Sequence, residues 1–160
     1  MCGIAGIYNT NASQDSLKVI GQQMLRQIHH RGPDGNGLIV RNGPNGAKTL
    51  LAHVRLSIIY LSEQGSQPMQ SNDGKTLIVF NWEIYNYSEL KLELEKEGAK
   101  FKSQTDTEVI LTAYNFWGLK CFERFIGMWA IALWDESQDK LILSRDRMGI
   151  KPLYFTNKGS

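Results

Sequence analysis

The sequence lacks the features that mark several large classes of protein. Its 160 residues contain two cysteines, Cys2 and Cys121, which form neither a disulfide framework nor a CxxC metal site. No apolar run approaches the ~18 residues that cross a bilayer, and no basic-then-apolar signal sequence opens the chain. The formal charge is +2 and the basic residues are scattered, so nothing favours nucleic-acid binding. We therefore expect a cytoplasmic protein that binds neither membrane nor nucleic acid.

Histidine is also scarce, and its placement argues against a metal centre. His29, His30 and His53 lack the spacing of a metal pair carried on one helix. What is present is ordinary for a globular protein, with 42% hydrophobic and 21% charged residues. This length and composition predict one domain over residues 1–160 and no cofactor within it.

The apolar periodicity predicts strands and helices in a definite order. Strands are expected at residues 2–9, 37–41, 49–59 and 76–81, a helix at 13–29, and a hairpin at 128–134 and 140–144. Two further helices are expected to open at Asn86 and Thr105, because Glu89 and Glu108 complete capping boxes there. The order is β, α, β-rich, α, α, β-rich, which favours sheets with helices on their outer faces.

Cys2 is the first candidate for chemistry. Removal of Met1 leaves Cys2 with a free α-amino group, whose pKa near 8 lets it act as a base beside its own thiol. One residue then supplies the nucleophile and the proton acceptor. The alternative is that a cysteine stands by chance at the second position of a strand.

Six motifs carry a family resemblance. "MCGIAGIYN", "HRGPDG", "LAHVRLSI", "NWEIYNY", "TDTEVIL" and "RDRMGIKPLY" follow one another over nearly the whole chain. Together they closely resemble the N-terminal glutaminase domain of asparagine synthetases, a class II, N-terminal-nucleophile glutamine amidotransferase. The resemblance implies an α+β fold, a four-layer αββα sandwich of two mostly antiparallel sheets. It also implies hydrolysis of L-glutamine to glutamate and ammonia through a glutamyl thioester.

The resemblance also assigns roles to individual residues. Cys2 matches the nucleophile, and the Asn81 side chain with the backbone N–H of Trp82 matches the donors to the oxyanion. Arg55 suits the α-carboxylate of glutamine, because its donors bind a carboxylate in pairs. Asp106 and Glu83 suit the α-ammonium. The expected substrate-binding set is Arg55, Leu56, Ser57, Ile58, Ile59, Asn81, Trp82, Glu83 and Asp106.

Each assignment has an alternative without a ligand. Arg55 could be a surface ion-pair residue at the end of a strand. Asp106 stands at an expected helix start, where a carboxylate stabilises the free N–H groups. Asn81 could simply end a strand in a turn. The six motifs taken together favour the glutamine site over these alternatives.

Trp82 is the clearest departure from the family pattern. The family motif reads Asn-Gly-Glu-Ile-Tyr-Asn, and Trp82 stands at the glycine. A tryptophan keeps the backbone N–H but is strained at φ > 0, at a typical cost of ~1–3 kcal/mol. Strand alternation predicts that the indole points away from Asn81 and Glu83. We therefore expect a glutaminase that is impaired relative to a glycine version.

The expected partner is an ATP-dependent synthetase domain or subunit that receives the ammonia. No glycine-rich nucleotide loop of that kind occurs in this sequence, so ATP and Mg²⁺ are expected to belong to that partner. The ammonia acceptor, aspartate or another carboxylate, is left open, as is a homodimer.

Three functions remain. The first is a working glutaminase, the second a catalytically weak glutamine-binding or regulatory module, and the third a hydrolase of some other amide. Turnover that depends on Cys2 separates the first from the second, and the paired Arg55 and Asp106 argue against the third.

Overall fold

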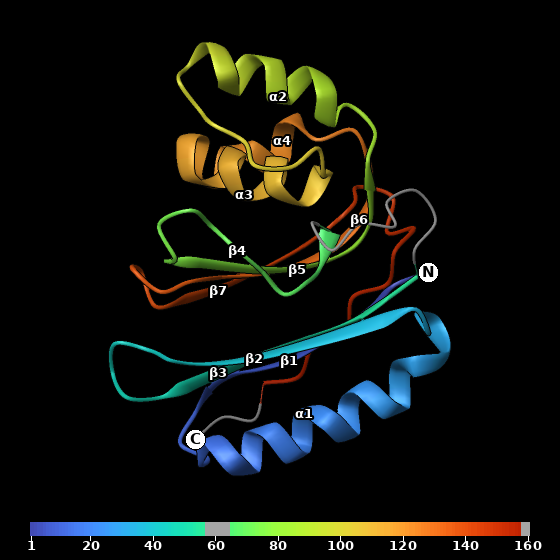
Figure 1. Ribbon diagram of the computed structural model, residues 1–160, viewed down its shortest axis with the longest axis vertical. Helices are drawn as coiled ribbons and strands as arrows, with labels where there is room; N and C mark the ends of the chain where they lie inside the picture. The colour runs from blue at the N-terminus through green and yellow to red at the C-terminus, as the bar shows by residue number, and fades with distance from the viewer. Residues whose placement is uncertain (57–64, 158–160) are drawn as a thin grey trace.

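A computed structural model describes residues 1–56 and 65–157, which form four stacked layers (Figure 1). The elements are β1 (Gly3–Thr10), α1 (Gln14–Ile28), η1 (His29–Arg31), β2 (Gly35–Asn42), β3 (Lys48–Arg55), β4 (Met69–Gln70), β5 (Thr76–Ile84), α2 (Tyr87–Lys96), α3 (Asp106–Trp117), η3 (Gly118–Lys120), α4 (Cys121–Arg124), β6 (Gly127–Asp135) and β7 (Lys140–Arg145).

The first sheet has the order β1-β3-β2 with antiparallel neighbours, and α1 covers its outer face. Leu17 and Leu25 of α1 pack against Leu50, Ala52 and Val54 of β3. These β3 residues alternate along the strand, so one face of the sheet is apolar toward the helix, as a period of two requires. The predicted amphipathic helix over 13–29 is confirmed, with Ser13 as its N-cap.

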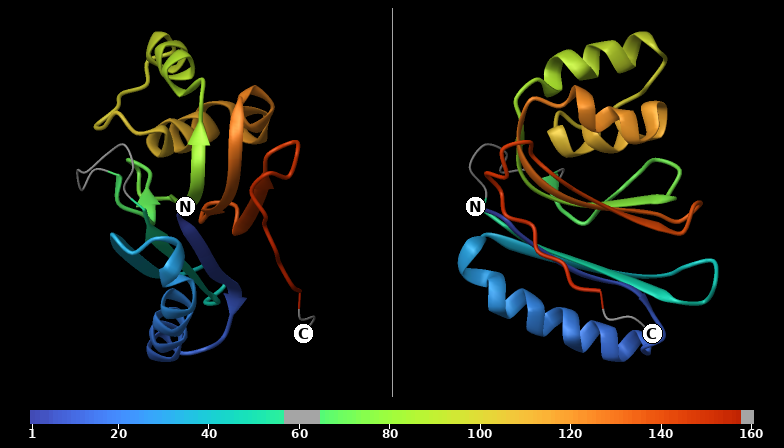
Figure 2. Two further views of the ribbon diagram at one scale, coloured as in Figure 1. Left: turned by 90° about the vertical axis from the view of Figure 1, so that its right-hand side faces the viewer. Right: turned by 180° about the vertical axis from the view of Figure 1, so that it is seen from behind.

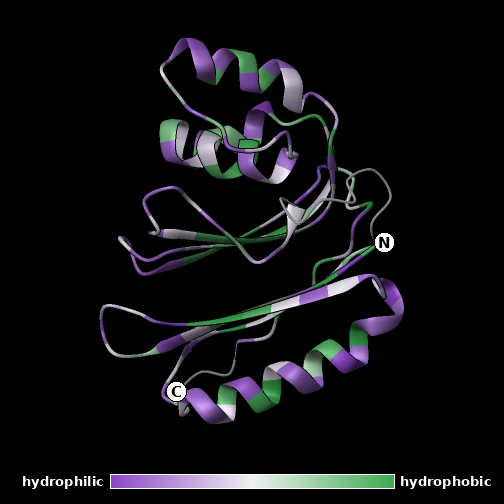
Figure 3. Ribbon diagram, in the orientation of Figure 1, coloured by the Kyte–Doolittle hydropathy of each residue, from purple (hydrophilic) through white to green (hydrophobic). Residues whose placement is uncertain are grey.

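The second sheet has the order β4-β5-β6-β7 and is also antiparallel throughout. The helices α2, α3 and α4 cover its outer face (Figure 1), where the largest apolar cluster lies. Phe80 of β5 and Ile131 of β6 belong to this cluster, together with Leu94 of α2 and Ile110 of α3. The strands carry much of the apolar colour in Figure 3, whereas the helices alternate apolar and polar faces.

The two sheets face each other through a third cluster. Leu51 of β3 packs there with Leu77 and Val79 of β5 and with Ala132 and Trp134 of β6. Both views in Figure 2 show the same stacking, with the segment after β7 passing beside the two sheets. The order of layers is helix, sheet, sheet, helix, which confirms the expected αββα sandwich.

Two details of the predicted elements are wrong. β5 does not stop at Asn81 but continues to Ile84, because β6 pairs with every residue from Thr76 to Ile84. A two-residue strand, β4, lies at Met69–Gln70, where no strand was predicted. Short edge strands of this kind carry too little apolar pattern to be recognised in a sequence.

The two predicted capping boxes have different outcomes. Thr105 caps α3 by accepting a hydrogen bond from Glu108 N, as expected. Asn86 stands at the start of α2, but its side chain makes no cap. Instead it donates to Arg124 O and accepts from Ile126 N, and so joins the start of α2 to the end of α4. A tertiary contact has replaced the local one.

Within the described part of the chain, no helix is both long and apolar enough to cross a membrane.

Candidate active site

A cavity of about 320 Å³ opens at the end of the sandwich where the N-terminus lies. Its described lining consists of Met1, Cys2, His53, Arg55, Leu56, Gly65, Gln67, Phe80, Trp82, Glu83, Tyr87, Thr105, Asp106 and Thr107. The lining includes six residues predicted from the sequence: Cys2, Arg55, Leu56, Trp82, Glu83 and Asp106. Both sheets and the start of α3 contribute, so the cavity lies at the seam between the sheets. Ser57, Ile58 and Ile59 lie outside the described residues.

Cys2 precedes β1, and Leu56 and Arg31 both contact it. Leu56 N lies 3.5 Å from Cys2 Sγ, within the range of a hydrogen bond to sulfur. Arg31 Nε donates to Cys2 O at 3.2 Å. The half-buried thiol is therefore fixed at the cavity wall, with a backbone donor beside it.

The "HRGPDG" loop packs on the end of β3 beside the cavity. Asp34 N donates to Arg55 O at 3.0 Å, and Pro33 bridges to Arg55. A Cβ at Gly32 would lie 2.6 Å from the backbone carbon of Arg55, so only glycine allows this close approach. The loop thereby supports Arg55, which enters the cavity from the end of β3.

Asp106 is the first residue of α3 and a half-buried acid of the cavity. Burial, with a smaller contribution from the nearby Glu83 carboxylate, raises the pKa of Asp106 to about 6 against the opposing effect of hydrogen bonds from the N–H groups of Ile84 and Thr107. Ile84 N donates to Asp106 Oδ2 at 3.2 Å. The Asp106 carboxylate therefore does lie at a helix start, as the alternative without a ligand proposed. The same residue also lines the cavity. A cation placed there would meet two carboxylates.

Trp82 corrects one sequence expectation. Its φ is 105°, a left-handed conformation that is rare for a non-glycine residue. Alternation predicted that Asn81 and Glu83 share a face and that Trp82 opposes them. The described lining instead contains Trp82 and Glu83 but not Asn81. The positive φ interrupts the alternation of the strand, and this explains the difference.

Asn81 is buried rather than exposed to the cavity. It alternates with Leu77 and Val79, which belong to the cluster between the sheets, so it lies on the same face of β5. Among the described residues, none forms a hydrogen bond with Asn81 Oδ1. Of the two predicted oxyanion donors, Trp82 belongs to the described lining of the cavity and Asn81 does not.

Gln67 and His53 line the cavity but were not predicted. Gln67 Oε1 accepts from Phe80 N at 2.6 Å, and Gln67 Nε2 donates to Thr107 Oγ1 at 3.3 Å. The His53 ring also bonds to the backbone of Phe80, and burial lowers the pKa of His53 to about 4. The imidazole is therefore neutral at pH 7. Both residues meet Phe80 only through the tertiary fold, so no local pattern could have revealed them.

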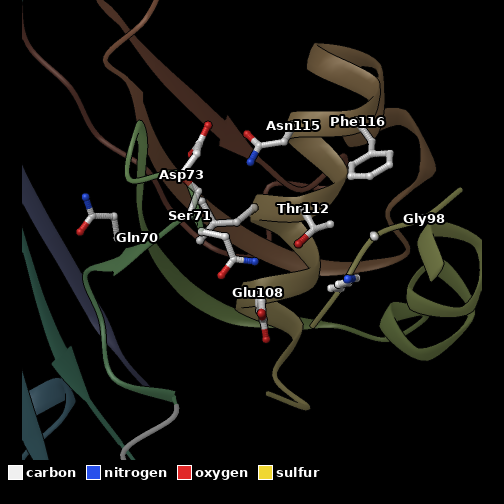
Figure 4. Close-up of a pocket in the computed structure, with 12 residues that line it drawn as sticks. Gln70, Ser71, Asp73, Gly98, Glu108, Thr112, Asn115 and Phe116 are labelled. Atoms are coloured by element: carbon white, nitrogen blue, oxygen red, sulfur yellow. The ribbon is translucent and has the colours of Figure 1, made fainter. Parts of the chain in front are cut away.

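A second cavity, of about 340 Å³, contains none of the predicted residues (Figure 4). It lies between α3 and the segments at Gln70 and Gly98. Its two acidic side chains are already hydrogen-bonded. Glu108 accepts from Lys102 N and Ser103 N at 2.8 and 2.7 Å, and Asp73 accepts from Ser71 Oγ and Lys75 N at 2.6 and 3.2 Å. The described lining of the second cavity therefore offers no carboxylate that is left for chemistry.

Other candidates for reactivity are also accounted for. Cys121 is fully buried, and burial raises the pKa of its thiol to about 12, so this thiol is unreactive. In the part of the chain that the structure describes, no group of His, Cys, Asp and Glu side chains is arranged to hold a metal ion.

Comparison with known proteins agrees with this geometry. A family model described as "Glutamine amidotransferase domain" matches residues 1–160. The chain belongs to this family. Asparagine synthetase 2 of Bacillus subtilis, described as glutamine-hydrolyzing, is 41% identical over 98% of the chain, which covers 20% of that relative. The amidase chry2 of Gibberella zeae is 42% identical over 98% of the chain, which covers 24% of it.

A solved structure shows the fold of this glutamine amidotransferase domain. Glutamine phosphoribosylpyrophosphate amidotransferase from B. subtilis superimposes with a TM-score of 0.68 at 19% identity, over 91% of this chain and 37% of that one. The chain thus spans a quarter or less of the two curated relatives named above.

Proposed function

We propose that this domain hydrolyses L-glutamine to glutamate and ammonia with Cys2 as the nucleophile. The observation that carries the proposal is the meeting of Cys2, Arg55, Glu83 and Asp106 in one cavity of about 320 Å³. Membership of the glutamine amidotransferase family supports the same function. A thiol, a cation and two carboxylates are the groups that a free amino acid with a side-chain amide requires, because it presents an electrophile and both termini.

The chemistry requires Cys2 to be the N-terminal residue, so we propose that Met1 is removed. Met1 is half exposed and lies in the cavity lining, where its loss would enlarge the opening. The free α-amine takes the thiol proton as sulfur bonds to the amide carbon. The protonated amine then passes a proton to the leaving nitrogen, the C–N bond breaks, and ammonia departs. Water hydrolyses the resulting thioester to glutamate.

The Trp82 N–H is the proposed donor to the oxyanion. Phe80 N and Ile84 N, two residues away on either side, donate to Gln67 and Asp106 on the edge of β5 beside the cavity. Amides two residues apart in a strand point the same way, so Trp82 N–H also faces this edge. A donor placed there in advance stabilises the tetrahedral intermediate more than the substrate.

Charge complementarity supports free glutamine as the substrate. Arg55 can bind the α-carboxylate through two parallel N–H donors, and Asp106 with Glu83 can bind the α-ammonium. A glutamine inside a peptide offers neither group. The proposed site therefore selects the free amino acid over a protein side chain.

The ammonia is proposed to pass to an ATP-dependent synthetase domain or subunit, where ATP and Mg²⁺ would act. The length and names of the relatives support this, since both an asparagine synthetase and an amidase share this domain. Tyr154 and Phe155 are 91% and 78% exposed and offer an apolar surface to such a partner. Free thiols at both cysteines fit a reducing, cytoplasmic setting.

The test is ammonia release from glutamine by the purified chain, with intact mass to confirm that Met1 is absent. We expect Cys2→Ala to lower release by roughly a thousandfold or more, because it removes the nucleophile. Cys121→Ala is the matched control and should keep the activity, since its thiol is buried away from the cavity. Equal activity in the parent and Cys2→Ala would contradict the proposal.

The strain at Trp82 favours a second candidate, a weak glutamine-binding or regulatory module. Its φ of 105° can aim the N–H poorly, and a lost oxyanion donor costs roughly a hundred- to a thousandfold in rate. Glutamine binding measured by calorimetry, without ammonia release from the processed chain, would favour this candidate over the first.

A further inference from the structure

The conformation of Trp82 raises the question of what holds it. A left-handed φ of 105° at a tryptophan persists only where the surrounding contacts outweigh the strain. Its indole Nε1 is buried and has no hydrogen-bond partner among the described residues. The ring therefore gains nothing from hydrogen bonding, and its position must come from packing and from its π face.

Lys151 provides that packing. Its Nζ lies 3.5 Å from the centroid of the Trp82 ring, a close cation–π contact. Lys151 is only 6% exposed, and its Nζ also lies 3.5 Å from Met1 Sδ. Burial lowers the pKa of Lys151, whereas the Asp146 carboxylate raises it and favours the ammonium. A desolvated ammonium interacts with an indole more strongly than an exposed one does.

Asp146 fixes Lys151 above Trp82. Asp146 Oδ2 accepts from Lys151 N at 2.9 Å and from Trp129 N at 3.3 Å. Trp129 is the residue of β6 that pairs with Trp82 of β5. The same carboxylate thus ties the segment after β7 to the strand position opposite Trp82, and the Lys151 side chain lies on the indole as a result.

We propose that Lys151 is a positioning residue that holds Trp82 in its left-handed conformation and so aims the Trp82 N–H into the cavity. This rests on the proposed function of that N–H. Lys151 itself is absent from the described cavity lining, so it acts through Trp82 rather than on the substrate. The contact between Lys151 and Trp82 stabilises a positive φ that a glycine at this position would adopt without strain.

The first test is a double-mutant cycle on glutaminase activity. Lys151→Met keeps the aliphatic chain and removes the charge, and Lys151→Arg keeps a cation that can stack on the ring. We expect Lys151→Met to lower kcat about tenfold with KM within about twofold, because an oxyanion donor acts in the transition state. Lys151→Arg should retain most of kcat. In the Trp82→Gly background, Lys151→Met should change kcat less than about twofold.

If Lys151→Met lowered kcat equally in the Trp82 and the Trp82→Gly backgrounds, Lys151 would act independently of Trp82, and this would overturn the proposal. No loss in the Trp82 background would also overturn it. A change in KM alone would contradict a role in aiming the donor. A loss that Lys151→Arg does not rescue would point to the shape of the side chain rather than to its charge, and this too contradicts the cation–π contact.

The second test does not depend on catalysis and separates this proposal from the proposed function. Urea unfolding of the same four proteins gives the coupling between positions 82 and 151. We expect Lys151→Met to raise the unfolding equilibrium constant about tenfold more when residue 82 is tryptophan than when it is glycine. Absence of coupling overturns the positioning role even if glutamine is hydrolysed. Coupling without any ammonia release supports the contact and overturns the proposed function instead.

A matched control exists in the same chain. Arg124 lies 3.8 Å from the centroid of the Trp117 ring, away from the cavity. Arg124→Met removes a cation–π contact of the same kind, so it should lower stability without changing kcat. If Lys151→Met is too unstable to purify with Trp82 but folds with Trp82→Gly, the coupling is established directly. Failure to fold in both backgrounds means that Lys151 supports the fold without Trp82, contrary to the proposal.

Discussion

At the scale of single residues, Asp106 has a strongly perturbed electrostatic setting in the cavity. Its half-buried carboxyl lies at the start of α3 near Glu83, and its pKa is raised to about 6. The ionised form, which can bind an ammonium, is therefore present above pH 6 and is lost as the pH falls below it. Substrate binding should follow this titration rather than that of an ordinary aspartate.

We predict that glutamine binds more weakly as the pH falls below about 6, with Kd rising up to about tenfold per pH unit. Binding to Cys2→Ala, measured by calorimetry, isolates this effect from the titration of the α-amine during catalysis. Asp106→Asn should bind weakly at every pH, with a flat profile. A profile in Asp106→Asn as steep as that of its parent would show that another group titrates.

Single residues also show the limits of the sequence. The predicted residues Cys2, Arg55, Glu83 and Asp106 line one cavity, and the sequence revealed them because each belongs to a motif that resembles a known family. The glycine of the family motif already pointed to strain at Trp82, whose φ is 105°, but strand alternation, which assumes a negative φ throughout, did not predict that Trp82 and Glu83 both line the cavity. Lys151 lies far along the chain from Trp82, and only the packing of the segment after β7 brings the two together.

At the scale of elements, β2 approaches the cavity more closely than its position in the first sheet suggests. A Cβ at Gly37 would lie 2.0 Å from Gln67 O, so β2 touches the backbone that carries Gln67. The Gln67 side chain in turn bonds Phe80 N and Thr107 Oγ1. A strand of one sheet thus sets the position of a residue that caps the edge of the other.

We predict that Gly37→Ala lowers stability by about 1–3 kcal/mol and raises the KM for glutamine, because Gln67 must move away from β5. Urea unfolding and ammonia release measure the two effects. Gly35→Ala, on the same strand, is the control, since its Cβ would meet only an ordinary contact at 3.8 Å. Equal changes in both variants would mean that β2 tolerates no side chain there, irrespective of Gln67.

The elements themselves were largely predictable, and the exceptions share a cause. α1, α3 and the β6–β7 hairpin carry clear periodicity and were placed correctly. The Asn86 side chain binds residues at the end of α4 instead of capping α2, and β5 runs on past Asn81 because β6 pairs with it. In each exception, a partner distant in sequence outweighed a local signal.

At the scale of the whole molecule, two buried groups give opposite responses to acid. The pKa of His53 is lowered from 6.5 to about 4, so the folded protein resists a proton that the unfolded chain accepts, and stability falls as the pH drops through that range. The pKa of Asp106 is raised from 3.8 to about 6, so the folded protein accepts a proton first, and stability rises over nearly the same range. Each effect reaches about 3 kcal/mol at its limit.

We predict that the two effects largely cancel between pH 4 and pH 6 and that single variants reveal them. His53→Gln should become more stable as the pH falls, because only the Asp106 effect remains. Asp106→Asn should become less stable over the same range. Urea unfolding at several pH values measures both slopes, and parallel slopes in the two variants would contradict the assignment.

The site at the seam has a further consequence for the molecule. Cys2 and Leu56 lie next to the ends of β1 and β3 in one sheet, whereas Trp82 and Glu83 belong to β5 in the other, and the apolar cluster around Leu51 and Val79 packs between the two sheets. The relative position of the proposed nucleophile, Cys2, and the proposed oxyanion donor, the Trp82 N–H, therefore depends on packing contacts that no substrate touches. Interdigitated side chains slide in discrete steps rather than continuously. Turnover in this protein should accordingly be sensitive to hydrostatic pressure and to core volume, and its rate could be tuned from the interior without altering a single residue that meets glutamine.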